Sequence, residues 1–193
     1  MKYLAIATFA AGLALAGAAD AAVFIVNAQA NSSSGGTGVS SIALSTGQSF
    51  TVSVDSDDLW NAGALPRWSN ADGLTGPLVA TGSDDSGEVA GTLIGSPFTA
   101  WTQHGLTAAY GSLVGEIGGI YKVLGTGFSG QAWNTGTLNL YYWDENAGDN
   151  TEFVSANISA IPEPVTWTMM ILGFGLAGTA LRRHGRGVVH AQA

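Results

Sequence analysis

The chain has 193 residues, of which 14 are acidic and 6 basic, and its net charge at pH 7 is −8. This charge disfavours nucleic acids and anionic lipids as partners, and the lack of cysteine excludes a disulfide scaffold. Of the three histidines only His104 lies outside the C-terminal tail, which excludes zinc hydrolase motifs that need two or three histidines.

The N-terminal segment has the order of a secretory signal peptide. Met1 and Lys2 give a positive start, residues 3–17 are apolar, and residues 19–21 offer small side chains for cleavage. We therefore expect residues 1–21 to be removed on export. A permanent first membrane helix is the alternative, but the apolar run is short and does not end in basic residues.

Residues 22–161 are expected to form one domain, since this length suffices for a hydrophobic core. Its only basic residues are Arg67 and Lys122, against 12 acidic ones. Such a surface favours cations and neutral ligands, although solubility outside the cell would explain it equally well.

Short apolar runs of period two, separated by Gly-rich turns, predict an antiparallel β-sandwich or barrel, because no window between the ends shows a helical period. The expected strands are Val23–Val26, Ser40–Leu44, Phe50–Val54, Leu78–Ala80, Val89–Ile94, Tyr110–Ile117, Ile120–Leu124, Thr137–Trp143 and Val154–Ile158. Residues 125–134 are expected to form a loop. Two alternating apolar faces should meet in the core: Phe50, Val52 and Val54 with Leu138, Leu140 and Tyr142.

Enzymatic motifs are not apparent in the domain. It has no Gly-x-Ser-x-Gly elbow and no phosphate-binding loop. Carboxylates are plentiful, so the pair that glycoside hydrolysis requires is available by count, but nothing in the sequence singles out one pair. We expect a protein that is not an enzyme.

Several short segments of the domain form a recognisable pattern: Gly47–Val52, Trp60 and Trp68 in the loop that follows, Gly111–Gly118, and Gly136–Asp144 leading into Gly148–Asn150. This pattern resembles the PA-I-type galactophilic lectins, which are small calcium-dependent bacterial lectins. The resemblance implies a jelly-roll β-sandwich of the galactose-binding-domain type.

The same resemblance implies a calcium site and a role in carbohydrate binding. Its side-chain ligands would be Asp144, Asp149 and Asn150, joined by a carbonyl from residues 145–147 and one near Trp60. Calcium binds six to eight oxygens from carboxylates, amides and carbonyls, so the residue types suit it. From composition alone, an ordinary polar turn would explain these residues.

This chain departs from the lectin pattern at three places. The loop from Asp144 to Asp149 is two residues shorter, and Asp149 stands where the family has an amide. The family's sugar-contacting His and Gln are replaced by residues 70–73 and a longer insertion, at whose end lie Gln103 and His104. Galactose specificity is therefore not implied.

The C-terminal tail combines a short motif, an apolar span and basic residues. Pro162, Glu163 and Pro164 precede the 17 uncharged residues 165–181, which Arg182, Arg183 and Arg186 follow. A helix of this length is about 25 Å long, near the short limit for crossing a bilayer. We expect a single transmembrane helix with its basic end in the cytoplasm. A buried core helix is the alternative, but the span has no polar face.

With Trp167 three residues after the second proline, the tail resembles the PEP-CTERM sorting signal in its PEPxxW variant, here residues 162–193. The resemblance implies an exosortase as partner and export across the inner membrane of a Gram-negative-type bacterium. The expected function is that of a secreted surface or biofilm-matrix protein that binds carbohydrate through Ca²⁺. The alternatives are a structural matrix or adhesion protein without a ligand site, and a polysaccharide hydrolase.

Overall fold

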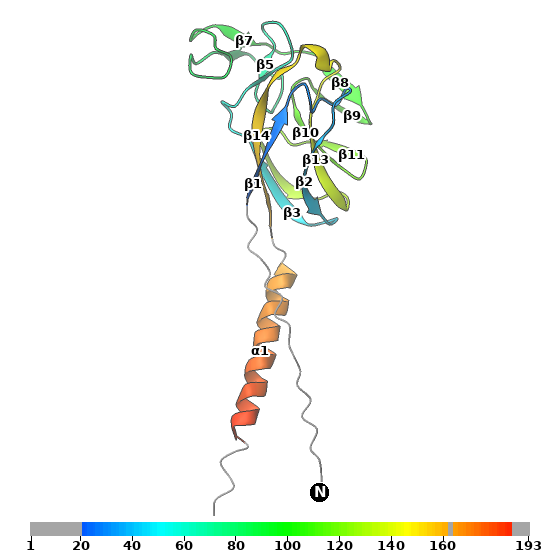
Figure 1. The fold of residues 1–193 in the computed structure, drawn as a ribbon, viewed down its shortest axis with the longest axis vertical. Coiled ribbons are helices and arrows are strands. Elements are labelled where there is room, and N and C mark those ends of the chain that lie inside the picture. The colour runs from blue at the N-terminus through cyan, green and yellow to red at the C-terminus, as the bar shows by residue number, and fades with distance from the viewer. Residues whose placement is uncertain (1–20, 162–163, 187–193) are drawn as a thin grey trace, which may run out of the picture. The chain divides into compact units, whose positions relative to one another are not determined.

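The computed structural model describes residues 21–161 and 164–186. The described residues fall into two compact units, a β domain and a C-terminal helix (Figure 1). The strands lie between Ala22 and Ala160, within the domain that the sequence predicts.

The first sheet contains six strands of the β domain. Its order is β12 (Gly127–Gln131), β3 (Ser49–Ser53), β14 (Thr151–Ala160), β4 (Trp60–Asn61) and β5 (Trp68–Ser69), with β1 (Ala22–Asn27) also paired to β14. All of these pairs are antiparallel. Period-two alternation buries Phe50 and Val52 of β3 and leaves Ser53 exposed.

The second sheet contains four antiparallel strands. Its order is β11 (Ile120–Val123), β10 (Leu113–Ile117), β13 (Gly136–Tyr142) and β2 (Val39–Leu44). Two short hairpins complete the domain. One joins β6 (Leu78–Val79) to β7 (Leu93–Gly95), and the other joins β8 (Ala100–Gln103) to β9 (Leu106–Ala109).

The hydrophobic core lies between the two sheets, and it confirms the predicted antiparallel β-sandwich. The residues predicted to face one another all belong to one buried cluster: Phe50, Val52 and Val54 with Leu138, Leu140 and Tyr142. Gly115 of β10 has no room for a side chain, because a Cβ there would lie 2.8 Å from Cδ1 of Leu138 and 2.9 Å from Cδ1 of Leu124. The packing of side chains on the inner face of this sheet thus depends on glycine at this position.

The structure corrects two strand predictions. Residues 127–131 form β12 rather than part of a loop, because they pair with β3 and the ring of Phe128 lies 5.0 Å from that of Phe50. The predicted strand Val89–Ile94 is wrong over most of its length, and only Leu93 and Ile94 fall within β7. Val89 is 78% exposed, so its side chain gains little from burial that would favour a strand there.

The C-terminal unit contains the helix α1 (Pro164–Arg186), so the predicted helix over residues 165–181 is confirmed. Its described side chains, from Met169 to Thr179 together with Leu181 and Arg182, are exposed. Among the helices in the described residues, however, none has both the length and the apolar character for crossing a membrane. The transmembrane span stays a prediction. The predicted signal peptide, apart from Ala21, and the residues Pro162 and Glu163 lie outside the described residues.

Candidate functional site

The three predicted side-chain ligands of calcium, Asp144, Asp149 and Asn150, lie on the connection between the two sheets. The connection leaves β13 after Tyr142 and enters β14 at Thr151, with one turn of 3₁₀ helix at Ala147–Asp149. Asn146 caps this turn, because its Oδ1 accepts a hydrogen bond from the backbone N of Gly148 at 3.1 Å. Its Nδ2 donates to Oδ1 of Asp149 at 2.9 Å, which fixes the Asp149 side chain.

Asp144 is a buried carboxylate at the start of this connection. It is 4% exposed, and its Oδ1 accepts a hydrogen bond from the backbone N of Glu145 at 2.7 Å. The hydroxyls of Ser33 and Ser34 donate to its main-chain carbonyl at 3.0 and 2.6 Å. Burial raises the pKa of Asp144, while the amide of Asn150 and backbone N–H groups oppose the rise.

Asn150 has a buried oxygen without a partner. The residue is 2% exposed, and its Nδ2 donates to the carbonyl of Ala28 at 3.2 Å. Its Oδ1 has no hydrogen-bond partner among the described residues. A buried acceptor left unpaired costs about 1–3 kcal/mol, so this oxygen is available to any cation or donor that reaches it.

The loop after β4 approaches the same connection. Asn61 of β4 pairs with Thr151, and a Cβ at Gly63 would lie 2.7 Å from Oδ2 of Asp149. Gly63 has a φ of 115°, so a larger residue would be both crowded and strained there. The structure thus brings Asp149, the loop after Trp60, Asp144 and Asn150 to one end of the sandwich.

Trp60 itself is part of the core. Its side chain is fully buried, and its Nε1 donates to the carbonyls of Gly111 at 2.8 Å and Asn70 at 3.2 Å. The indole cannot stack on a sugar in this position. If Trp60 contributes to a metal site, its main-chain carbonyl would be the ligand.

The types of donor atom suit a hard cation better than zinc. Within the described parts of the chain, no three His, Cys, Asp or Glu side chains gather as a metal cluster. The site instead offers two carboxylates, from Asp144 and Asp149, and the amide oxygen of Asn150. Calcium accepts this mixture of carboxylate, amide and carbonyl oxygens, whereas zinc favours nitrogen and sulfur.

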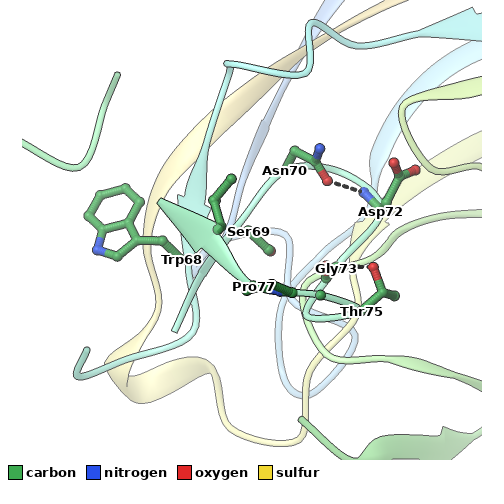
Figure 2. A pocket seen from close by; sticks show the side chains of 9 residues that line it. Trp68, Ser69, Asn70, Asp72, Gly73, Thr75 and Pro77 are labelled. Atoms are coloured by element: carbon green, nitrogen blue, oxygen red, sulfur yellow. Dashed lines mark hydrogen bonds between the residues drawn. The ribbon is translucent and has the colours of Figure 1, made fainter. Parts of the chain in front are cut away.

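A separate pocket lies beside β5 and the loop that follows it (Figure 2). Its volume is about 130 Å³, and residues 68–70, 72, 73 and 75–78 line it. Ser69 is 3% exposed, and its Oγ has no hydrogen-bond partner among the described residues. Oδ1 of Asn70 accepts a hydrogen bond from the backbone N of Asp72 at 3.0 Å.

The carboxylate of Asp72 reaches across to another loop. It accepts hydrogen bonds from the backbone N of Thr126 at 2.8 Å and from its hydroxyl at 2.9 Å. In the sequence, residues 70–73 stand out only because they occupy the place of the sugar contacts in the lectin pattern. The pocket itself has no signal in the sequence, since its walls are brought together by folding.

Comparison with known proteins finds a sorting motif in the tail and a solved structure that is similar to this chain. Residues 160–184 match the PEP-CTERM protein-sorting motif, so the chain carries this motif, as the sequence predicts. A solved structure described as "EclA N-terminal domain; PllA-like lectin" is similar, with a TM-score of 0.47 and 18% sequence identity. The match covers 72% of this chain and 95% of that chain. No curated protein matches the sequence.

Proposed function

We propose that this chain, which carries the PEP-CTERM sorting motif, is an exosortase-processed surface protein whose β-sandwich binds carbohydrate through one calcium ion. The observation that carries the proposal is the unpartnered Oδ1 of Asn150, buried beside the buried carboxyl of Asp144. The motif at residues 160–184 supports export and sorting to the cell surface.

Among the described residues, no basic side chain contributes to the pKa of Asp144, and Oδ1 of Asn150 has no hydrogen-bond donor. Burial disfavours the charged form of Asp144, and the orphaned oxygen of Asn150 carries a desolvation cost. A bound cation would offset both penalties at once. Arg67, one of the domain's two basic residues, instead places its guanidinium 3.8 Å from the centre of the Phe98 ring.

Calcium is the cation that this set of oxygens favours. Asp144, Asp149 and Asn150 would supply side-chain oxygens, and the carbonyls of Trp60 and of residues 145–147 would complete the protein's share. Magnesium demands tight octahedral geometry and retains its waters, which suits a mixed set from separate loops less well. Bound calcium would supply positive charge and open coordination positions that sugar hydroxyls can fill.

The test is a glycan array probed with the full-length protein in calcium and in chelator. Binding that requires calcium, and that is lost in Asp144→Asn, is expected. Calcium binding without any glycan would favour a structural matrix or adhesion role. Release of reducing ends from a soluble polysaccharide would favour a hydrolase, which we do not expect.

A further inference from the structure

The outer face of the second sheet carries a row of polar and aromatic side chains that crosses all four strands. In register, Tyr121 of β11 lies opposite Glu116 of β10, Glu116 opposite Asn139 of β13, and Asn139 opposite Ser40 of β2. Strands lie about 4.8 Å apart, so the row extends about 14 Å. Figure 1 shows these four strands side by side.

Hydrogen bonds hold the polar part of this row in place. Nδ2 of Asn139 donates to Oε2 of Glu116 at 2.7 Å, and the hydroxyl of Ser40 lies 2.9 Å from Oδ1 of Asn139. The backbone N of Gly119 donates to the other oxygen of Glu116. The side chains therefore form a fixed surface and lose little freedom when a ligand binds.

Two further aromatic rings, of His104 and Tyr141, lie beside Tyr121 at the border of the row. The exposed ring of His104, at the turn of the β8–β9 hairpin, stacks on Tyr121 with centroids 4.7 Å apart and planes at 14°. Tyr141 lies 5.8 Å from Tyr121 and is half-buried. Gly38, directly beyond the paired residue Val39, leaves room for Tyr141, since a Cβ there would lie 2.5 Å from Cζ of that ring.

The charge of this face favours neutral polymers over acidic ones. Glu116 is the charged residue of the row, and the basic residue of β11, Lys122, alternates to the other side, where its Nζ lies 4.9 Å from the centre of the Trp133 ring. An acidic polymer would be repelled by Glu116 and by the net charge of the domain. Aromatic faces flanking amide, hydroxyl and carboxylate groups are suited to uncharged sugar rings and their hydroxyls.

From these observations we propose that this row, which we call the Tyr121–Ser40 face, is a second and calcium-independent binding surface for a neutral polysaccharide chain. Its length favours several sugar residues over a single one. The tyrosine and histidine rings would contact the sugar faces, and Glu116 and Asn139 would bond hydroxyls. None of the candidate calcium ligands belongs to this face.

The experiment is retention of the full-length protein on a panel of immobilised neutral polysaccharides and one anionic polysaccharide, all in chelator. Tyr141→Ala, Asn139→Ala and His104→Asn remove one contact each, and asparagine is chosen because His104 has a φ of 48°. Phe153→Ala is the matched control, since Phe153 is an aromatic residue, 45% exposed, on the other sheet.

We expect the protein to bind at least one neutral polysaccharide in the presence of chelator. Tyr141→Ala should weaken this binding about tenfold, which corresponds to about 1.4 kcal/mol of binding free energy. Phe153→Ala should leave the binding unchanged. Melting temperatures identify any variant that unfolds, and Asn139→Ala and His104→Asn then serve in place of Tyr141→Ala. Absence of binding in chelator, a preference for the anionic polymer, or variants that bind like the parent would overturn the proposal. None of these outcomes bears on the calcium site, which calcium titration tests separately.

Discussion

The ring of Tyr142 meets the indole of Trp60 edge to face, with centroids 4.6 Å apart and planes at 87°. Trp60 belongs to the first sheet and Tyr142 ends β13 of the second, so this contact joins the two sheets just before the chain reaches Asp144. Both side chains are fully buried. Truncating a buried aromatic residue lowers the free energy of unfolding by about 3–5 kcal/mol. This contact therefore contributes strongly to holding the two sheets together beside the candidate site.

The hydroxyl of Tyr142 offers a first prediction. It is buried without a hydrogen-bond partner among the described residues, so Tyr142→Phe should leave stability unchanged or raise it by about 1 kcal/mol. The control is Tyr110→Phe, because the Tyr110 hydroxyl donates to Oε2 of Glu145 at 2.8 Å. That variant should lose about 1 kcal/mol. Urea denaturation measures both, and a large loss in Tyr142→Phe would show a missing partner.

Calcium should raise the melting temperature of the protein more than magnesium does. A ligand at 100 times its Kd stabilises a fold by about 2.7 kcal/mol, which corresponds to about 10 °C for a domain of this size. Asp144→Asn should abolish most of the shift, since it removes a charged ligand. Asp57→Asn, an exposed carboxylate on another loop, should retain it. Equal melting-temperature shifts with calcium and magnesium would indicate that the connection between β13 and β14 is an ordinary polar turn and not a calcium site.

Stability should also depend on pH through Asp144. Burial raises the pKa of Asp144 in the fold, so its protonated form favours folding. That contribution is complete below the unfolded pKa of about 3.9 and is lost as pH rises through the folded value. Without calcium, Asp144→Asn should therefore show a smaller fall in unfolding free energy across this window. Part of the fall should remain, because burial also raises the pKa of Asp58.

Calcium should reverse this pH dependence, since a cation favours the carboxylate form of Asp144. Denaturation curves at several pH values, with calcium and with chelator, make the comparison. If the curves with chelator do not differ between the parent and Asp144→Asn, then burial does not raise the pKa of Asp144 in the folded protein.

Both ends of the chain are expected to be cleaved off in the cell during export. Mass spectrometry of the native extracellular protein should find neither residues 1–21 nor the tail after the Pro162-Glu163-Pro164 motif. The motif at residues 160–184 supports the second cleavage. Deleting the exosortase gene of the host should leave the tail attached. A mature extracellular protein with an intact tail would contradict the proposal.

The sequence predicted the strands that depend on local alternation, and it failed where pairing decides. Leu138, Leu140 and Tyr142 alternate with polar residues, and β13 formed as expected. Gly127 and Gly130 weaken the intrinsic preference of β12, so only its register with β3 makes it a strand. The β8–β9 hairpin likewise depends on its packing against Trp143, whose Nε1 donates to the carbonyl of Trp101 at 3.0 Å.

For the candidate site, the sequence suggested residue types and the fold determined their surroundings. Asp144, Asp149 and Asn150 are close in sequence, so their proximity was predictable. The burial of Asn150 was not, because its amide bonds to Ala28, 122 residues away. The row from Tyr121 to Ser40 was equally hidden, since its members come from four separate strands.

The long last strand, β14, connects the candidate calcium site with the sorting motif. Asn150 lies just before the first residue of β14, and the sorting motif begins where its ten residues finish, about 30 Å away. Ala22, at the start of β1, pairs with Ile158 near that same finish. Both expected cleavage sites therefore lie near one end of the domain, and the candidate calcium site lies at the other end. A protease engaged at the first end would leave ligand capture at the second unobstructed, before and after release.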